Sequence, residues 1–171
     1  MTTETAPVTS EKMLTTRDLR RMYWRSTFLL GSFNFERMQA MGFCYTLMPA
    51  IRKFYRDDKT AQAAALKRHL EFYNTHPWVS SVVFGVTAAM EEQKSKGEDI
   101  SEETITSVKV GLMGPLAGVG DPIFWGTARP VLAALGASLA LNGSIVGPLL
   151  FFVGIDRKST RLNSSHALAS R

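Results

Sequence analysis

The longest uncharged stretch of the chain limits the folds that are open to it. Residues 130–155 form a run of 26 residues without a single Asp, Glu, Lys or Arg. About 20 apolar residues are enough for a helix to cross a bilayer, so this run predicts a membrane-spanning helix. An Asn-Gly-Ser sequence at 142–144 and a Gly-Pro pair at 147–148 interrupt it. Such a broken helix is tolerated at membrane depth where it is buried in protein or lines a cavity.

Shorter apolar segments precede this run. Met38–Ile51 and Pro77–Met90 each hold 14 uncharged residues, which is too short to span a bilayer and is typical of a buried or re-entrant helix. A helix is expected between the two segments, with Thr60 as its N-cap, and another after the second segment, with Asp99 as its N-cap.

An amphipathic helix is predicted to begin near Thr16 or Asp18. Its apolar residues recur at helical spacing and are Leu19, Met22, Tyr23, Trp24, Phe28 and Leu29. Four arginines fill much of the other face, namely Arg17, Arg20, Arg21 and Arg25. A helix of this kind lies either in a membrane interface or on the surface of a soluble bundle. The expected fold class is therefore all-α, a polytopic membrane protein fragment with amphipathic, re-entrant and broken transmembrane helices.

The positive charge of the chain is concentrated at its end. The formal charge of +5 would suit a nucleic-acid-binding protein, but residues 156–171 hold four basic residues against one acid. At residue 156 the apolar run changes abruptly into an Arg/Ser-rich sequence, which we expect to be foreign to the natural protein. A genuine basic terminus that anchors a helix on the cytoplasmic side is the alternative. No nucleic-acid partner is expected.

Composition divides the chain into three parts and excludes several chemistries. Residues 1–16 are polar and Thr-rich and predict a flexible tail, 17–155 hold the apolar segments, and 156–171 form the foreign tail. Cys44 is the only cysteine, so no internal disulfide is possible. His69 and His76 lack a third ligand at a metal spacing, and no nucleophile–base motif is present. We expect no catalytic residue, metal or cofactor.

A Gly/Pro-rich section, residues 111–130, holds five glycines and three prolines. It predicts a tight, non-helical loop that places Asp121 and Arg129 in an apolar context, where ionisable residues are costly and usually functional. The alternative role for Asp121 is to cap a helix that begins at Pro122. The residues expected to shape the loop are Gly114, Pro115, Gly118, Gly120, Pro122 and Arg129.

Four polar residues cluster where the first 14-residue segment begins: Asn34, Glu36, Arg37 and Gln39. Carboxylate, guanidinium and carboxamide groups are those that hydrogen-bond sugar hydroxyls, so one hypothesis is a substrate site. The alternative is an ordinary polar helix start, with Glu36 near the positive end of the helix dipole.

Four stretches resemble the IID component of the mannose-type phosphoenolpyruvate-dependent sugar phosphotransferase systems. They are SFNFERMQAMGFCYTLMPAIRKFY (32–55), RHLEFYNTHPWV (68–79), GVTAAMEEQ (85–93) and KVGLMGPLAGVGDPIFWGTARPVLAALGASLALNGSIVGPLLFF (109–152). The resemblance extends from about residue 11 to residue 155. Because members of the family continue with further membrane segments, the chain resembles only their N-terminal part.

The resemblance implies a transport subunit and not a free-standing enzyme. It implies pairing with a IIC subunit in the bacterial inner membrane, a path for mannose-type hexoses, and higher oligomers of IIC/IID pairs. Cytoplasmic IIA and IIB proteins would supply phosphate through histidines on other subunits. It favours substrate contact by Asn34, Glu36, Arg37, Gln39 and Asp121. The alternative is a soluble α-helical binding or interaction module, which the long uncharged run disfavours.

Overall fold

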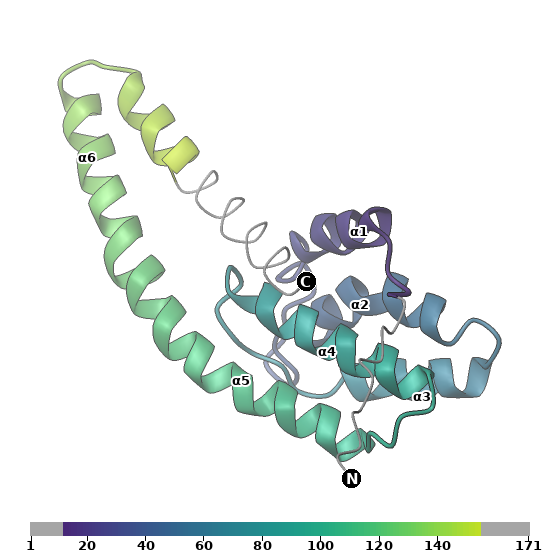
Figure 1. The fold of residues 1–171 in the computed structure, drawn as a ribbon. Coiled ribbons are helices and arrows are strands. Elements are labelled where there is room, and N and C mark those ends of the chain that lie inside the picture. Colours follow the sequence, from purple (N-terminus) through teal and green to yellow (C-terminus); the bar gives the residue numbers. More distant parts are fainter. Residues whose placement is uncertain (1–11, 155–171) are drawn as a thin grey trace, which may run out of the picture.

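The computed structural model describes residues 12–154, which are helical and contain no β-strand within that range (Figure 1). The elements are α1 (Thr16–Ser26), α2 (Ala40–Phe54), α3 (Lys59–His69), α4 (Ser80–Ser95), α5 (Glu102–Ile123), the π-helical turn η1 (Phe124–Ala128) and α6 (Arg129–Leu141). Residues 146–154 are also helical. The prediction of an all-α fold is confirmed.

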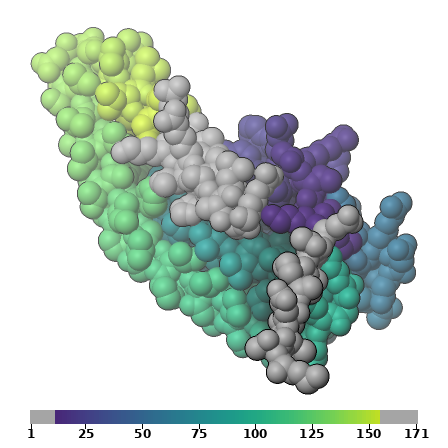
Figure 2. Space-filling model, viewed as in Figure 1, coloured from purple at the N-terminus to yellow at the C-terminus, as the bar shows by residue number. Residues whose placement is uncertain are grey.

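The helices form two parts. α1 to α4 pack together with the first half of α5, and α5, η1 and α6 continue as one long curved arm (Figure 1). Helix 146–154 folds back beside α6 at the far end of the arm (Figure 1). We call the part formed by α1 to α4 and the first half of α5 the body. The space-filling view shows the arm extending well beyond it (Figure 2).

Local hydrogen bonds explain where the helices begin. The Thr15 hydroxyl accepts from the Asp18 backbone N–H, and the Asp18 carboxylate accepts from that of Thr15, which forms a capping box ahead of α1. The predicted start of this helix is thus confirmed. The caps predicted at Thr60 and Asp99 are wrong. Asp58 caps α3 and Ser101 caps α5, because only the residue directly before a helix can reach its free N–H groups.

Only part of the predicted N-terminal tail is described. The Met13 backbone N–H donates to Glu92 Oε1 over 2.8 Å, and Met13 and Leu14 pack against the core. Of the flexible tail predicted at residues 1–16, the structure describes residues 12–16, which lead into α1 at Thr16, and residues 1–11 lie outside the described residues. The foreign tail predicted at 156–171 lies outside them too.

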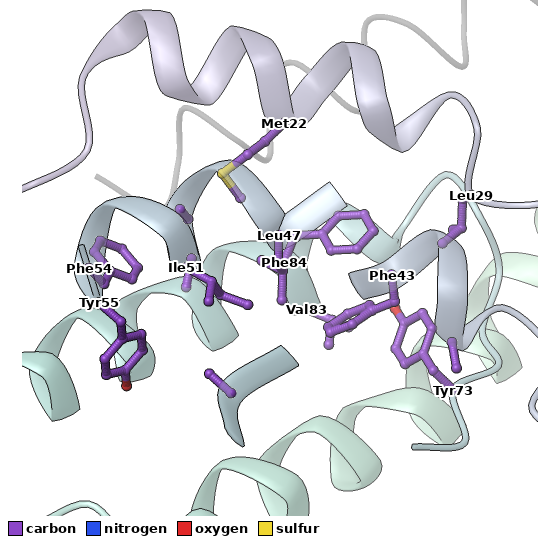
Figure 3. Close-up of a cluster of buried hydrophobic side chains, with 14 of the residues drawn as sticks. Met22, Leu29, Phe43, Leu47, Ile51, Phe54, Tyr55, Tyr73, Val83 and Phe84 are labelled. Carbon is purple, nitrogen blue, oxygen red and sulfur yellow. The ribbon is translucent and has the colours of Figure 1, made fainter. Parts of the chain in front are cut away.

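Helix α2 is the centre of the hydrophobic core. Phe43, Leu47, Ala50, Ile51 and Phe54 are buried at helical spacing, and α2 contacts α1, α3 and α4. Their side chains meet those of the neighbouring elements, Met22, Leu29, Tyr73, Val83 and Phe84 among them (Figure 3). The prediction of a buried helix in Met38–Ile51 is therefore confirmed.

A glycine lets α1 approach this helix. A Cβ atom on Gly42 would overlap the backbone carbonyl of Leu29. Any side chain at this position would therefore push the connection after α1 away from α2. The close approach allows Leu29 to be fully buried in the core.

A buried carboxylate links three of the helices. Glu91 continues the buried face of α4, eight residues after Val83. Its Oε1 accepts hydrogen bonds from Arg68 Nε (3.1 Å) and His69 Nε2 (2.8 Å) on α3. Its Oε2 accepts from the Tyr55 hydroxyl (2.8 Å), directly after α2, and from a second Arg68 nitrogen (3.3 Å). We call these four residues the Glu91 network.

The surroundings fix the charge states of the network. Burial by itself raises the pKa of Glu91, but the hydrogen bonds from His69 and Tyr55 and the charge of Arg68 outweigh it and lower the pKa to about 2. Burial lowers the pKa of His69, and the hydrogen bond to Glu91 offsets this only in part. His69 is therefore neutral at pH 7, with its proton on Nε2 facing the carboxylate.

The arm is a single helix of 40 residues, Glu102–Leu141, about 60 Å long at the usual helical rise. Within the described residues it is the one helix that is long and apolar enough to cross a membrane. Only 11% of its most apolar window is buried inside the protein. Of the uncharged run predicted to span the membrane, 130–155, residues 130–141 belong to this helix and residues 146–154 form the helix that follows the turn.

The predicted non-helical loop at 111–130 is wrong. Five of its expected members, Gly114, Pro115, Gly118, Gly120 and Pro122, lie inside α5, and Arg129 begins α6. Asp121 lies in the middle of the helix and caps nothing.

A π-helical turn follows Pro122 within the long helix. A proline inside a helix removes one backbone hydrogen bond and crowds the preceding turn. Directly after it, the chain widens into η1, where the Arg129 N–H bonds the carbonyl of Phe124, five residues earlier. The Thr127 hydroxyl donates to the Pro122 carbonyl over 3.0 Å. These two bonds pair the carbonyls of Phe124 and Pro122 in the widened turn.

The predicted break at 142–144 is confirmed, whereas the one at 147–148 is not. α6 ends at Leu141, and the chain turns through Gly143, whose φ of +76° suits a glycine. Pro148 lies in the first turn of helix 146–154, where its missing N–H does no harm. A Cβ on Gly136 would lie 3.0 Å from the Gly147 carbonyl oxygen, so these glycines allow the close backbone approach common between membrane helices.

We expect Glu91→Gln to lower the melting temperature of the detergent-solubilised chain far more than Glu98→Gln. Removal of one partner of a buried ion pair typically costs about 3–5 kcal/mol, and Arg68 would lose its buried counter-charge. Glu98 is exposed and makes no side-chain contact within the described residues. Thermal unfolding followed by circular dichroism measures both variants. Equal shifts would contradict the stabilising role of the network.

The network also predicts a loss of stability on acidification. The pKa of Glu91 is about 2 in the folded chain against 4.5 when exposed, so its contribution is complete above pH 4.5 and is lost as the pH falls towards 2. The lowered pKa of His69 acts in the same direction below 6.5. Melting temperatures recorded against pH should fall less steeply below 4.5 in Glu91→Gln than in the unmodified chain. Parallel profiles would show that another group is responsible.

Candidate functional site

The candidate site is the junction where residues 73–78 contact both the turn at 34–39 and helix α5. Figure 1 shows the segment between α3 and α4 passing close to α5. The turn that holds Asn34–Gln39 and the part of α5 that holds Gly120 were predicted as separate sites, and both contact this short segment. We call this region the 73–78 junction.

Asn34 shapes the turn. Its side-chain oxygen accepts hydrogen bonds from the backbone N–H groups of Glu36 (3.1 Å) and Arg37 (2.8 Å), the pattern by which Asn stabilises turns. The backbones of Asn34 and Met38 exchange two hydrogen bonds of 3.3 and 2.9 Å, and Met38 adopts a φ of +52°. This oxygen is used within the turn, so Asn34 positions its neighbours.

Gln39 fastens the turn to the junction. Its buried carboxamide donates to the Thr75 carbonyl over 2.8 Å and accepts from the Thr75 N–H over 3.4 Å. Its own backbone N–H donates to the Tyr73 carbonyl over 2.8 Å. All of these contacts are internal, so Gln39 is a positioning residue.

Glu36 and Arg37 are left as the exposed polar pair of the turn. Their side chains lie 3.4 Å apart and are 81% and 55% exposed, which makes the pair weak but accessible. Phe33 and Phe35 stand beside them with ring centroids 6.3 Å apart. The turn thus offers a carboxylate, a guanidinium and aromatic surface together. These groups suit a ligand with several hydroxyls.

Thr75 and His76 of the 73–78 junction contact α5 and η1. The Thr75 hydroxyl donates to the Met113 carbonyl over 3.0 Å. The ring of His76 stacks on Phe124 at 4.9 Å and 16° and meets Trp78 and Trp125 edge-on. A Cβ on Gly120 would lie only 2.5 Å from the Cβ of His76. Gly120 is therefore required for this contact and not for a loop.

His76 holds an unused donor. Its Nδ1 accepts from the Trp78 N–H over 3.4 Å, which places the proton of the neutral ring on Nε2. This Nε2 is buried and has no hydrogen-bond partner in the part of the chain that the structure describes. Burial lowers the pKa of His76, and the charge of Asp121 partly opposes this. The ring is therefore neutral at pH 7.

Asp121 and Arg129 are exposed on the arm. No ion pair joins them or links either to the turn at 34–39 within residues 12–154. The Arg129 guanidinium lies over the Trp125 ring, 4.9 Å from its centroid. The structure thus brings Asn34, Glu36, Arg37 and Gln39 together and leaves Asp121 on a separate surface that reaches the junction through His76. No three His, Cys, Asp or Glu residues of the described range are grouped closely enough to hold a metal ion.

The sequence analysis missed the Glu91 network and the junction. Glu91 had a usable signal, because it extends the helical spacing of the buried face of α4. Thr75 and His76 had none, since their partners Gln39, Met113 and Gly120 lie about 36 or more residues away in sequence and no local pattern encodes such contacts.

We expect Gly120→Ala to lower the melting temperature of the chain and Gly118→Ala to leave it unchanged or raise it. The added methyl group meets His76 at position 120, whereas nothing lies within 4 Å of a Cβ at position 118. Alanine otherwise favours a helix over glycine by about 1 kcal/mol. Thermal unfolding in detergent compares the two variants. A fall of equal size in both would contradict the packing role of Gly120.

Comparison with known proteins identifies the family. Residues 13–160 match the family model of the PTS system mannose/fructose/sorbose family IID component. The chain is 56% identical over 150 residues to the mannose-specific EIID component of Escherichia coli (strain K12), covering 88% of this chain and 53% of that protein. It is 62% identical over 142 residues to the fructose permease IID component of Bacillus subtilis (strain 168), covering 83% and 51%.

A solved structure has the same fold. The chain aligns with a cryo-EM structure of the mannose transporter ManYZ in complex with microcin E492 (MceA), with a TM-score of 0.90 and 51% identity, over 94% of this chain and 58% of that one. The chain spans about half the length of the curated relatives it matches. The resemblance drawn from the four sequence stretches is confirmed, and the chain belongs to the IID component family of the mannose/fructose/sorbose phosphotransferase systems.

Proposed function

We propose that the chain is the N-terminal part of a subunit that, with a IIC subunit, forms the path for mannose-type hexoses across the bacterial inner membrane. The observation that carries this proposal is the bare apolar arm of a chain that belongs to the IID family. The relatives named for mannose and fructose and the likeness to a mannose transporter support the substrate class.

The exposed apolar surface of the arm requires contact with protein or lipid. Large apolar side chains remain exposed along the arm and on the turn and helix 146–154 that follow it, namely Val119, Ile123, Trp125, Val131, Leu135, Leu141, Ile145, Val146, Leu149 and Phe152. A patch of this extent marks a protein or membrane contact. Nothing lies within 4 Å of a Cβ built at Gly111, Gly114 or Gly118 on α5, so a neighbouring helix can approach the backbone closely there. We assign these surfaces to the IIC subunit and to lipid, in a higher oligomer of IIC/IID pairs.

Phosphorylation belongs to other subunits in this proposal. His69 and His76 are both buried, the first against Glu91 and the second among aromatic rings. Neither can present a free nitrogen to a phosphorylated protein in this arrangement. The cytoplasmic IIA and IIB proteins therefore carry the phosphate, and the chain contributes binding and passage of the sugar.

Glu36 and Arg37 are the side chains proposed to contact the hexose directly. They are accessible, they carry opposite charges, and they hydrogen-bond hydroxyl groups as acceptor and donor. Asn34 and Gln39 hold the turn that presents them. Asp121 is proposed as a further substrate-contacting residue from the arm, coupled to the turn through His76 and the 73–78 junction.

We expect Glu36→Gln and Arg37→Gln, placed in the complete subunit, to raise the KM for mannose uptake by about tenfold or more. Loss of one charged hydrogen-bonding partner typically costs about 1.5–3 kcal/mol of binding free energy. Uptake of labelled mannose is measured in cells that lack their own mannose-type IID subunit and express the IIC, IIA and IIB partners. Lys59→Gln removes a charge from another exposed site and should leave the KM unchanged. Unaltered KM values in both turn variants would remove Glu36 and Arg37 from the sugar site.

A further inference from the structure

A cleft rich in arginine lies between α1 and α2. Its α1 lining recurs at positions 17, 20, 21, 24 and 25, which fall on one face of a helix. Its volume is about 700 Å³, and its lining residues are Arg17, Arg20, Arg21, Trp24, Arg25, Met48, Pro49 and Arg52. We call it the arginine cleft.

The charge of the cleft is not balanced by the protein. Arg25 donates to the Tyr45 carbonyl over 3.1 Å and stacks on the Tyr45 ring. Across residues 12–154, the guanidinium groups of the other four arginines of the cleft make no hydrogen bond or ion pair. Asp18, the one acid on α1, is held by Lys53 at 2.6 Å and by Thr15. Four neighbouring guanidinium groups that repel one another favour a bound anion.

The chemistry of the cleft suits a phosphate group. Guanidinium groups bind phosphate oxygens in pairs of parallel hydrogen bonds, and several can share one phosphate. Arg17, Arg20, Arg21 and Arg52 are exposed and Arg25 is half-buried, so a ligand can reach the cleft without a change in the fold.

Aromatic residues beside the cleft indicate where the phosphate comes from. Trp24 lines the cleft and is 68% exposed, and Phe28, one turn further, is 64% exposed. The sequence pattern placed both on the apolar face of the predicted helix, and of that face only Met22 and Leu29 are buried. Trp is enriched at the level of lipid headgroups, and basic helices with exposed aromatic residues lie in that layer. A phosphate carried by a soluble protein would leave these rings in water.

We propose that the arginine cleft binds the headgroup phosphate of an anionic phospholipid, with Trp24 and Phe28 inserted at the boundary of the acyl chains. The bound lipid holds α1 flat on the membrane surface, and α1 in turn packs on α2 at the centre of the core. This inference requires the membrane location of the chain but not its role in sugar uptake, so a failure of the uptake test leaves it standing.

The first test measures lipid selection in detergent. The purified full chain is titrated with phosphatidylglycerol or phosphatidylcholine of the same acyl length, and bound lipids are counted by native mass spectrometry. We expect binding of phosphatidylglycerol to be at least about tenfold tighter. The triple variant Arg20→Gln/Arg21→Gln/Arg52→Gln should lose this preference, since each basic residue near an anionic headgroup contributes about fivefold.

A matched variant separates the cleft from the overall charge. Arg56→Gln/Lys59→Gln/Lys67→Gln also removes three exposed positive charges, but none of them lines the cleft. It should keep the preference for phosphatidylglycerol. No preference in the unmodified chain, or an equal loss in both triple variants, would overturn the proposal. Competition by inorganic phosphate at the same concentration would identify a site for free phosphate and overturn the lipid source.

A second measurement places the lipid next to Trp24. The full chain is reconstituted in nanodiscs that contain equal amounts of the two lipids, with bromine atoms on only one of them. The Trp24 signal is the difference between the unmodified chain and Trp24→Phe. We expect stronger quenching when phosphatidylglycerol is the brominated lipid, and a loss of this difference in the cleft triple variant. Equal quenching by the two lipids would overturn the proposal.

Discussion

The carboxylate of Glu91 is the contact on which the packing of the body depends. It accepts hydrogen bonds from Arg68 and His69 on α3 and from Tyr55 at the end of α2, while it sits on α4 itself. Arg68 also lies 2.8 Å from Glu102 at the start of α5, and Lys109, about two turns further along α5, donates to the Arg68 carbonyl. Four helices thus meet around one buried charge, whose desolvation is offset only when every partner is in place.

This arrangement positions the base of the arm. Because α5 begins at the network, the direction in which the arm leaves the body is fixed at its base. The 73–78 junction fixes it a second time, through Thr75 on Met113 and His76 on Gly120. The same short segment holds the Glu36–Arg37 turn through Gln39. The arm and the turn proposed to meet the sugar are therefore connected through one short segment.

Sequence reasoning reached the parts of the structure that depend on local patterns. The uncharged segments predicted the all-α class and the buried α2, and the Asn-Gly-Ser sequence predicted the turn after α6. It failed where the same local pattern is compatible with two structures. Glycines and prolines at 111–130 are common in loops, yet here Gly120 allows close contact with His76, and α5 continues through Pro115 and Pro122. The apolar face of α1 was also read too broadly, because spacing alone could not separate Trp24 from Met22. The four residues of the predicted sugar cluster do lie together. Only the hydrogen bonds of the structure distinguish Asn34 and Gln39, which hold the turn, from Glu36 and Arg37, whose side chains are exposed.

The central claim is that the bare arm packs against a IIC subunit, and site-specific photocrosslinking tests it most directly. A photoreactive residue is placed at Gly114, on the open glycine surface of α5, and in a control at Glu98 on the body. The full chain is expressed together with the IIC subunit, illuminated in membranes and analysed for adducts. The account predicts a IID–IIC adduct from position 114 and none from position 98. Adducts of position 114 with lipid alone, or equal IIC adducts from both positions, would contradict it.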